Sequence, residues 1–178
     1  SGGDGGDISI KVGDGNTLDG GHISLFAGLT NADADSTGGS ISMISGYSKI
    51  RSSGTIIIRT LNAGTTGVSG ELMFSTGTTS SGASGSISIG TGTASGGDGG
   101  DISIKVGDGN MLDGGHISLF AGLTHADADS TGGSISMISG YSDIRSSGTI
   151  IIRTLNAGDK GVSGELMFST GTTSSGAS

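Results

Sequence analysis

The sequence predicts an all-β protein, a flattened β-solenoid of about eleven coils of 15–18 residues. Two observations lead to this prediction. Six-residue clusters with large apolar side chains at their second and fourth positions recur along the chain, and a period of two is that of a strand. Glycine precedes every cluster, which places a residue that bends easily at each strand end.

The clusters, called hexamers below, alternate with connectors of nine to twelve residues. The first two hexamers read DISIKV and HISLFA, and those that follow read SISMIS, TIIIRT, ELMFST and SISIGT. They occupy residues 7–12, 22–27, 40–45, 55–60, 71–76, 86–91, 101–106, 116–121, 134–139, 149–154 and 165–170. Similar units at a short, nearly fixed spacing are typical of solenoids. A stack of antiparallel β-hairpins produces the same alternation and stays open as an alternative.

The connectors are long enough for the solenoid only if they are nearly extended. Six strand residues advance about 20 Å, and nine connector residues reach about 30 Å at most. Glycine follows nine of the eleven hexamers as well, Leu61 and Leu155 being the exceptions. Because glycine adopts positive φ without penalty, we expect sharp corners at both ends of each strand.

A longer repeat divides the chain into two copies within one continuous repeat domain. Copy one is residues 1–94 with six strand units, and copy two is residues 95–178 with five. Residues 1–84 recur as 95–178 with five differences, all in connectors: Thr17 to Met111, Asn31 to His125, Lys49 to Asp143, Thr65 to Asp159 and Thr66 to Lys160. The differences indicate that the connectors are solvated and tolerate change.

Composition excludes several classes of function. The net charge of −8 argues against nucleic acid as a partner, because nucleic-acid binding needs a basic surface. No apolar run approaches the ~20 residues that span a bilayer, so no membrane insertion is expected. The absence of cysteine removes disulfides, thiolate metal sites and a cysteine nucleophile.

The recurring [GS]-G-x-[IL] element, seen as GGDI, GGHI, GGSI, SGTI, SGEL and SGSI, covers essentially the whole chain. It resembles the Gly/Ser/Thr-rich β-solenoid repeats of surface adhesins and passenger domains. The resemblance implies secretion, display at the cell surface, and an adhesive or structural role. It supplies no catalytic residue.

No cofactor is expected, although two segments suggest calcium, and a tolerated surface bulge is the favoured interpretation of the second. In GGDGGDISI the place that a calcium-binding nonapeptide gives to an apolar residue holds Ser9, which favours a glycine corner instead. In NADADSTGG the alternating oxygen ligands are typical of the start of a hard-cation loop. The candidate metal ligands are Asn31, Asp33, Asp35, Asp127 and Asp129.

Catalysis is not expected, and no catalytic residue is assigned. His22 and Ser24 share a strand face with Asp19 nearby in sequence, but a hydrolase triad needs a concave pocket and an oxyanion hole. Ranked threonines on a flat face suggest ice binding. The sixth hexamer position runs Val12, Ala27, Ser45, Thr60, Thr76 and Thr91, so the rank is broken.

The outward strand face carries apolar side chains where a solvated face is polar. We expect an interface there, or a cover from the return side of the coil. The predicted interface residues are Phe26, Ile44, Ile57, Met73, Phe120, Ile138, Ile151 and Met167.

Together these observations predict a non-enzymatic structural or adhesive repeat module of a larger extracellular or cell-surface protein. The alternative is a solenoid that binds a divalent cation or ice. Open solenoid ends expose unpaired backbone, so a homo-oligomer or end-to-end self-association is expected.

Overall fold

The fold lacks the strands that the sequence predicts. A computed structural model describes residues 5–31, 36–125 and 130–173, and these contain neither helix nor strand. The predicted all-β class is therefore wrong, both as a flattened β-solenoid of eleven coils and as a stack of antiparallel β-hairpins. The hexamers are present as extended segments, but no ladder of backbone hydrogen bonds joins one to the next in the described part of the chain.

The predicted dry core is absent too. No side chain within the described ranges is buried, and the large apolar residues of the hexamers are exposed, except Val12 and Val106, which are half-buried. The chain presents 18261 Å² of accessible surface, whereas a compact monomer of this mass presents about 7,800 Å². The alternating pattern therefore fixes the local backbone without supplying a surface against which the apolar face packs.

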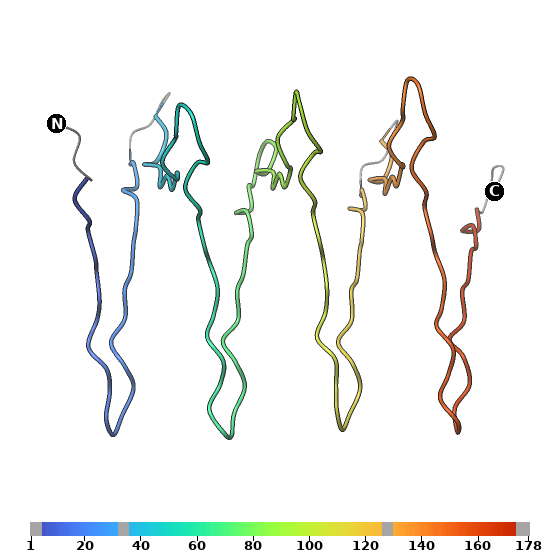
Figure 1. Ribbon diagram of the computed structural model, residues 1–178, viewed down its shortest axis with the longest axis horizontal. Coiled ribbons are helices and arrows are strands. Elements are labelled where there is room, and N and C mark those ends of the chain that lie inside the picture. The colour runs from blue at the N-terminus through green and yellow to red at the C-terminus, as the bar shows by residue number, and fades with distance from the viewer. Residues whose placement is uncertain (1–4, 32–35, 126–129, 174–178) are drawn as a thin grey trace. The chain divides into compact units, whose positions relative to one another are not determined.

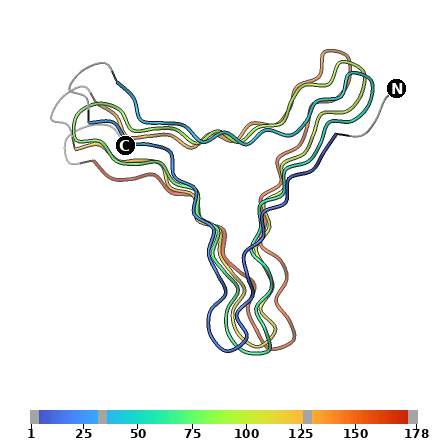
Figure 2. The same ribbon diagram turned by 90° about the vertical axis from the view of Figure 1, so that its left-hand side faces the viewer.

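The visible order is an alternation of extended run and loop. Figure 1 shows extended stretches, for example 7–12 and 22–27, joined by a connector at which the trace turns back, and the turned view of Figure 2 shows the same turn. The connectors bend near their middles, for example at 16–18, 49–51 and 110–112. The chain divides into two units, Ser1–Ile89 and Gly90–Ser178, and each contains several of these hexamer and connector pairs.

The corners are not made by positive φ at the glycines that bracket the hexamers. Among the described glycines only Gly67 and Gly82 adopt positive φ, at 116° and 114°. Both lie in the middle of a connector, so the expected left-handed corners at strand ends are not found. The bracketing glycines have another role, described in the next subsection.

One connector differs between the copies in a way that the sequence explains. In copy two the Gly161 amide donates to the Gly158 carbonyl at 3.4 Å and closes a turn over Asp159 and Lys160. In copy one the corresponding residues are Thr65 and Thr66, and Gly67 takes positive φ instead. Aspartate favours turns because its side chain hydrogen-bonds nearby backbone, which stabilises the tighter form.

We expect the Asp-Lys pair to form this turn in either copy when it occupies these two connector positions. The double substitution Thr65→Asp and Thr66→Lys should move Gly67 out of positive φ. It should also protect the Gly67 amide from exchange with solvent. The reverse change, Asp159→Thr with Lys160→Thr, should move Gly161 into positive φ. Backbone couplings of the two glycines in ¹⁵N-labelled protein measure both changes, and unchanged couplings in either variant would contradict the assignment.

Candidate functional site

The best-defined local structure lies at the connector bases, meaning the two ends of a connector where they meet. In copy one the amide of the glycine before a hexamer donates to the carbonyl of the glycine after the preceding hexamer: Gly21 to Gly13 at 3.2 Å, Gly39 to Gly28 at 2.7 Å and Gly54 to Gly46 at 2.9 Å. Copy two repeats all three, from Gly115, Gly133 and Gly148. Each bond brings the end of one hexamer next to the start of the next.

A second kind of base uses threonine. Four connectors follow a hexamer that ends in threonine: 61–70, 77–85, 92–100 and 155–164. The side chain of that threonine lies against the glycine before the next hexamer. The Thr91 hydroxyl also donates to the Gly100 carbonyl at 3.1 Å. Threonine at this position therefore accompanies the connectors whose bases lack the glycine-to-glycine bond in the described part of the chain. This gives the broken rank of threonines a local role.

The two bracketing glycines are not equivalent. A Cβ added to the glycine before a hexamer meets neighbouring atoms at all ten internal connectors. At Gly39 this Cβ lies 3.0 Å from the Gly28 amide nitrogen, and at Gly21 it falls on the Val12 side chain. A Cβ added to the glycine after a hexamer meets nothing within 4 Å at any of the nine such positions. The crowded position is always glycine, and the open position admits Leu61 and Leu155.

Exposure of matching residues in the two copies shows that a connector base covers apolar surface. Ile8, in the first hexamer, is 93% exposed, whereas its counterpart Ile102, which follows another hexamer in the chain, is 54% exposed. Phe74 is 65% exposed, and Phe168 in the last hexamer is 78% exposed. These side chains therefore gain partial cover where another hexamer lies before or after their own in the chain, and none becomes buried in the described ranges.

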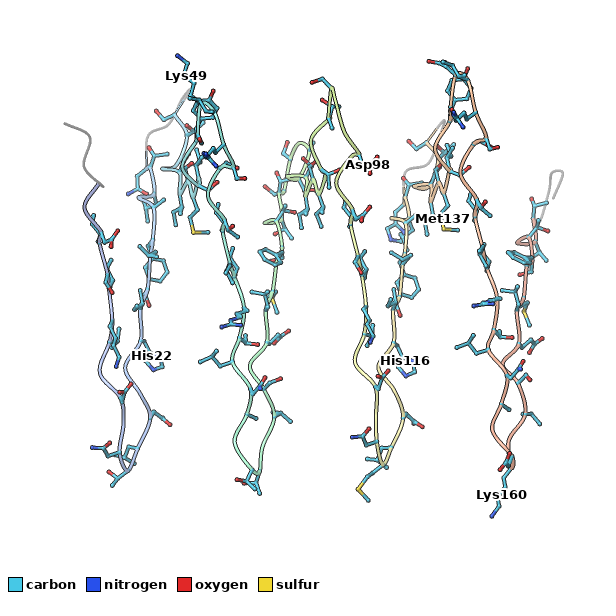
Figure 3. All side chains as sticks on the ribbon, viewed as in Figure 1. His22, Lys49, Asp98, His116, Met137 and Lys160 are labelled. Atoms are coloured by element: carbon cyan, nitrogen blue, oxygen red, sulfur yellow. The ribbon has the colours of Figure 1, made fainter. Side chains whose placement is uncertain are left out.

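Side chains stabilise some connectors from outside the base. The Ser48 hydroxyl accepts from the Arg51 amide at 3.0 Å, and Ser142 does the same for Arg145. The Lys11 ammonium lies 3.3 Å from the Asp14 carboxylate, and both side chains are exposed. An exposed ion pair of this kind contributes little to stability. Lys49 and Lys160 stand at connector tips and point away from the chain (Figure 3).

Of the five predicted metal ligands, the structure describes one. Asp33, Asp35, Asp127 and Asp129 lie outside the described residues, and Asn31 is described and exposed. Among the described residues no cluster of three or more His, Asp or Glu side chains is positioned to hold a metal ion. Calcium binding therefore stays a prediction from the sequence.

The predicted interface residues are all exposed. Phe26 is 90% exposed and Met73 is 69% exposed. Ile44, Ile57, Phe120, Ile138, Ile151 and Met167 lie between these values. In seven of the eight hexamers they are more exposed than both the second- and the fourth-position side chain, for example 75% at Ile57 against 48% at Ile56 and 47% at Ile58. This exposure does not show a partner, so the interface stays a prediction.

Within the described ranges the histidines lie on the surface of the chain. His22 and His116 occupy matching exposed places at the start of their hexamers, next to a connector base (Figure 3). A surface depression beside Phe168, Ser169 and Thr170 is lined by three consecutive residues of one hexamer, so it converges no groups from different elements. Within the described ranges there is also no helix of the length and apolarity that crossing a membrane requires.

Comparison with known proteins gives no match: no family model, curated protein or solved structure is significantly similar to this chain.

Proposed function

We propose that this chain is a non-enzymatic structural or adhesive repeat module of an extracellular or cell-surface protein, and that it works by associating with further copies of itself. The observation that supports this proposal is the exposure of the apolar hexamers throughout the described residues. Large contiguous apolar surface on a protein generally marks an interaction site. In this chain it recurs eleven times at similar spacing, which suits a repetitive assembly better than a single ligand site.

The connectors fit the other half of this proposal. All five differences between the copies lie in connectors, and the hexamers are identical. A module that associates through its hexamers and displays its connectors tolerates change in the connectors alone. The placement at a surface rests on the resemblance to the Gly/Ser/Thr-rich repeats of adhesins and passenger domains.

Sedimentation velocity across a concentration series tests the proposal. We expect the mean mass to rise above 17.1 kDa as the protein is concentrated from the micromolar to the millimolar range. The double variant Ile56→Ser and Ile58→Ser, with its counterpart at Ile150 and Ile152, should weaken association at least tenfold. That expectation follows from the roughly 1.5–3 kcal/mol that one buried isoleucine side chain contributes.

A control replaces two apolar residues with serine in connectors, where the hexamer variant replaces four. Leu61→Ser with Leu155→Ser removes exposed apolar residues beside the same hexamers, and we expect it to associate like the parent chain. A mass of one chain at all concentrations would refute the proposed function. Equal weakening by the hexamer and connector variants would refute the role of the hexamers.

A further inference from the structure

The hexamers carry no net charge, although the chain is strongly acidic. They contain four acidic residues and four basic residues: Asp7, Glu71, Asp101, Glu165, Lys11, Arg59, Lys105 and Arg153. Because the whole chain has 16 acidic and 8 basic residues, its net charge of −8 lies entirely outside the hexamers. Two copies that approach each other therefore repel through their connectors, whereas their hexamers meet without net charge repulsion.

The order of residues in DISIKV makes this hexamer complementary to itself in one direction. When two copies run antiparallel with Ser9 opposite Ser9, Asp7 of each faces Lys11 of the other, and Ile8 faces Ile10. In a parallel pairing in register, Asp7 faces Asp7 and Lys11 faces Lys11. Directly opposed side chains interact across paired strands, and like charges there are destabilising. Copy two repeats the same residues at 101–106.

The hexamer backbone is available for such pairing. In the described part of the chain no residue of a hexamer takes part in a backbone-to-backbone hydrogen bond, because all of these bonds join connector glycines. An extended segment with free N–H and C=O groups is a template for a strand from another chain. Lys11 is engaged with Asp14, but that pair is exposed and exchanges at little cost.

The accessible surface is sufficient for the contact. The chain exposes 18261 Å², roughly 10,000 Å² more than a compact monomer of its mass. A stable interface needs only about 1,200–2,000 Å². A second copy is the partner whose apolar spacing and charge order both match.

We propose that two copies of this chain pair antiparallel through the DISIKV hexamers, 7–12 and 101–106, with Asp7 and Asp101 facing Lys11 or Lys105 of the second copy. This inference rests on the proposed function, since it specifies how the copies associate. It leaves the acidic connectors outside the contact.

A charge exchange within the hexamer tests the direction of pairing. The exchanged variant carries Asp7→Lys, Lys11→Asp, Asp101→Lys and Lys105→Asp, which preserves net charge and composition. It should associate with itself as the parent chain does, because antiparallel pairs remain Asp opposite Lys. Mixed with ¹⁵N-labelled parent chain, it should form mixed dimers about tenfold below the statistical proportion, as native mass spectrometry measures, since each mixed hexamer pair sets like charges opposite at ~0.2–1 kcal/mol each.

Two controls isolate the hexamer charges. The connector exchange Asp159→Lys with Lys160→Asp should mix statistically with the parent chain. Asp14→Asn with Asp108→Asn, introduced into both partners, removes the local effect on Lys11 and should leave the sorting unchanged.

The outcomes separate this inference from the proposed function. Self-sorting of the exchanged variant supports antiparallel pairing. Statistical mixing, with association intact, overturns the inference and leaves the proposed function standing, and enrichment of mixed dimers overturns it in favour of parallel pairing. Absence of any association in the parent chain overturns both.

Discussion

Replacing Gly15 with alanine should open the base of its connector, whereas replacing Gly13, two residues earlier, should leave the base closed. A Cβ on Gly15 falls on the Leu18 carbonyl oxygen and 2.7 Å from the Asp19 carbonyl carbon, and both are backbone atoms that cannot rotate away. A Cβ on Gly13 meets nothing within 4 Å. Both substitutions restrict the unfolded chain alike, so their difference reports the closed connector.

The expected effect is the loss of the bond from the Gly21 amide to the Gly13 carbonyl, which holds the base at 3.2 Å. A bond of this kind contributes about 0.5–1.5 kcal/mol, so we expect the closed population to fall roughly two- to tenfold. The chain has no cysteine, so Ser9→Cys and Ser24→Cys introduce two unique labelling sites on the hexamers that flank this connector.

Distances between spin labels at these two sites measure the opening. Gly15→Ala should broaden the distribution and shift it to longer distance, and Gly13→Ala should reproduce the parent distribution. The counterpart pair Gly109→Ala and Gly107→Ala should behave the same way in copy two, where a Cβ on Gly109 meets the Asp113 and Leu112 carbonyl oxygens. Identical distributions for Gly15→Ala and the parent chain would show that the closed base is absent in solution.

The prediction that the glycines at hexamer ends shape the corners was right for the glycine before each hexamer, but the predicted cause was wrong. Glycine before each hexamer marks where connector ends meet, and the structure places close contacts at all ten internal positions of this kind. The predicted cause was positive φ, whereas the observed cause is the approach of backbone and of the sixth hexamer side chain. The positions of the glycines do not distinguish these two causes. Glycine is invariant before hexamers, whereas Leu61 and Leu155 replace it after two of them, and this difference was a usable sign that only the first position is crowded.

The strands were mispredicted because a strand is defined by its partner. The alternation in TIIIRT or ELMFST indicates an extended segment with one apolar face, and this property depends on the local sequence alone. Pairing is non-local, and in the described residues the hexamer backbone groups remain unpaired within the chain. The side chains that were expected to share a dry face, such as Ile56 and Ile58, are 48% and 47% exposed.

The candidate sites were predictable only in part. The glycine and threonine positions that form the connector bases can be read from the sequence, but the close approach of the two connector ends is seen only in the structure. The metal candidates depend on residues of NADADSTGG that mostly lie outside the described ranges, and the sequence pattern remains their only support. The interface candidates are the more exposed apolar side chains in seven of their eight hexamers, and only a measurement of association shows whether they meet a partner.

A second large effect is expected in the backbone itself as copies associate. In dilute protein the hexamer amides should exchange with solvent close to the rate of an unstructured chain, because they have no backbone partner in the described chain. The Gly21, Gly39 and Gly54 amides should exchange about two- to tenfold more slowly, as single exposed hydrogen bonds allow. When copies pair, protection should appear in the hexamers and exceed that of the connector bases.

Residue-resolved amide exchange of the full chain at low and high concentration tests the account most directly. The account predicts that protection in the dilute protein is confined to hydrogen-bonded amides of the connectors, such as those of the base glycines and of Arg51. Additional protection of 7–12 and 101–106 should appear only where sedimentation shows association. Strong protection of the hexamer amides in a dilute, monomeric chain would contradict it.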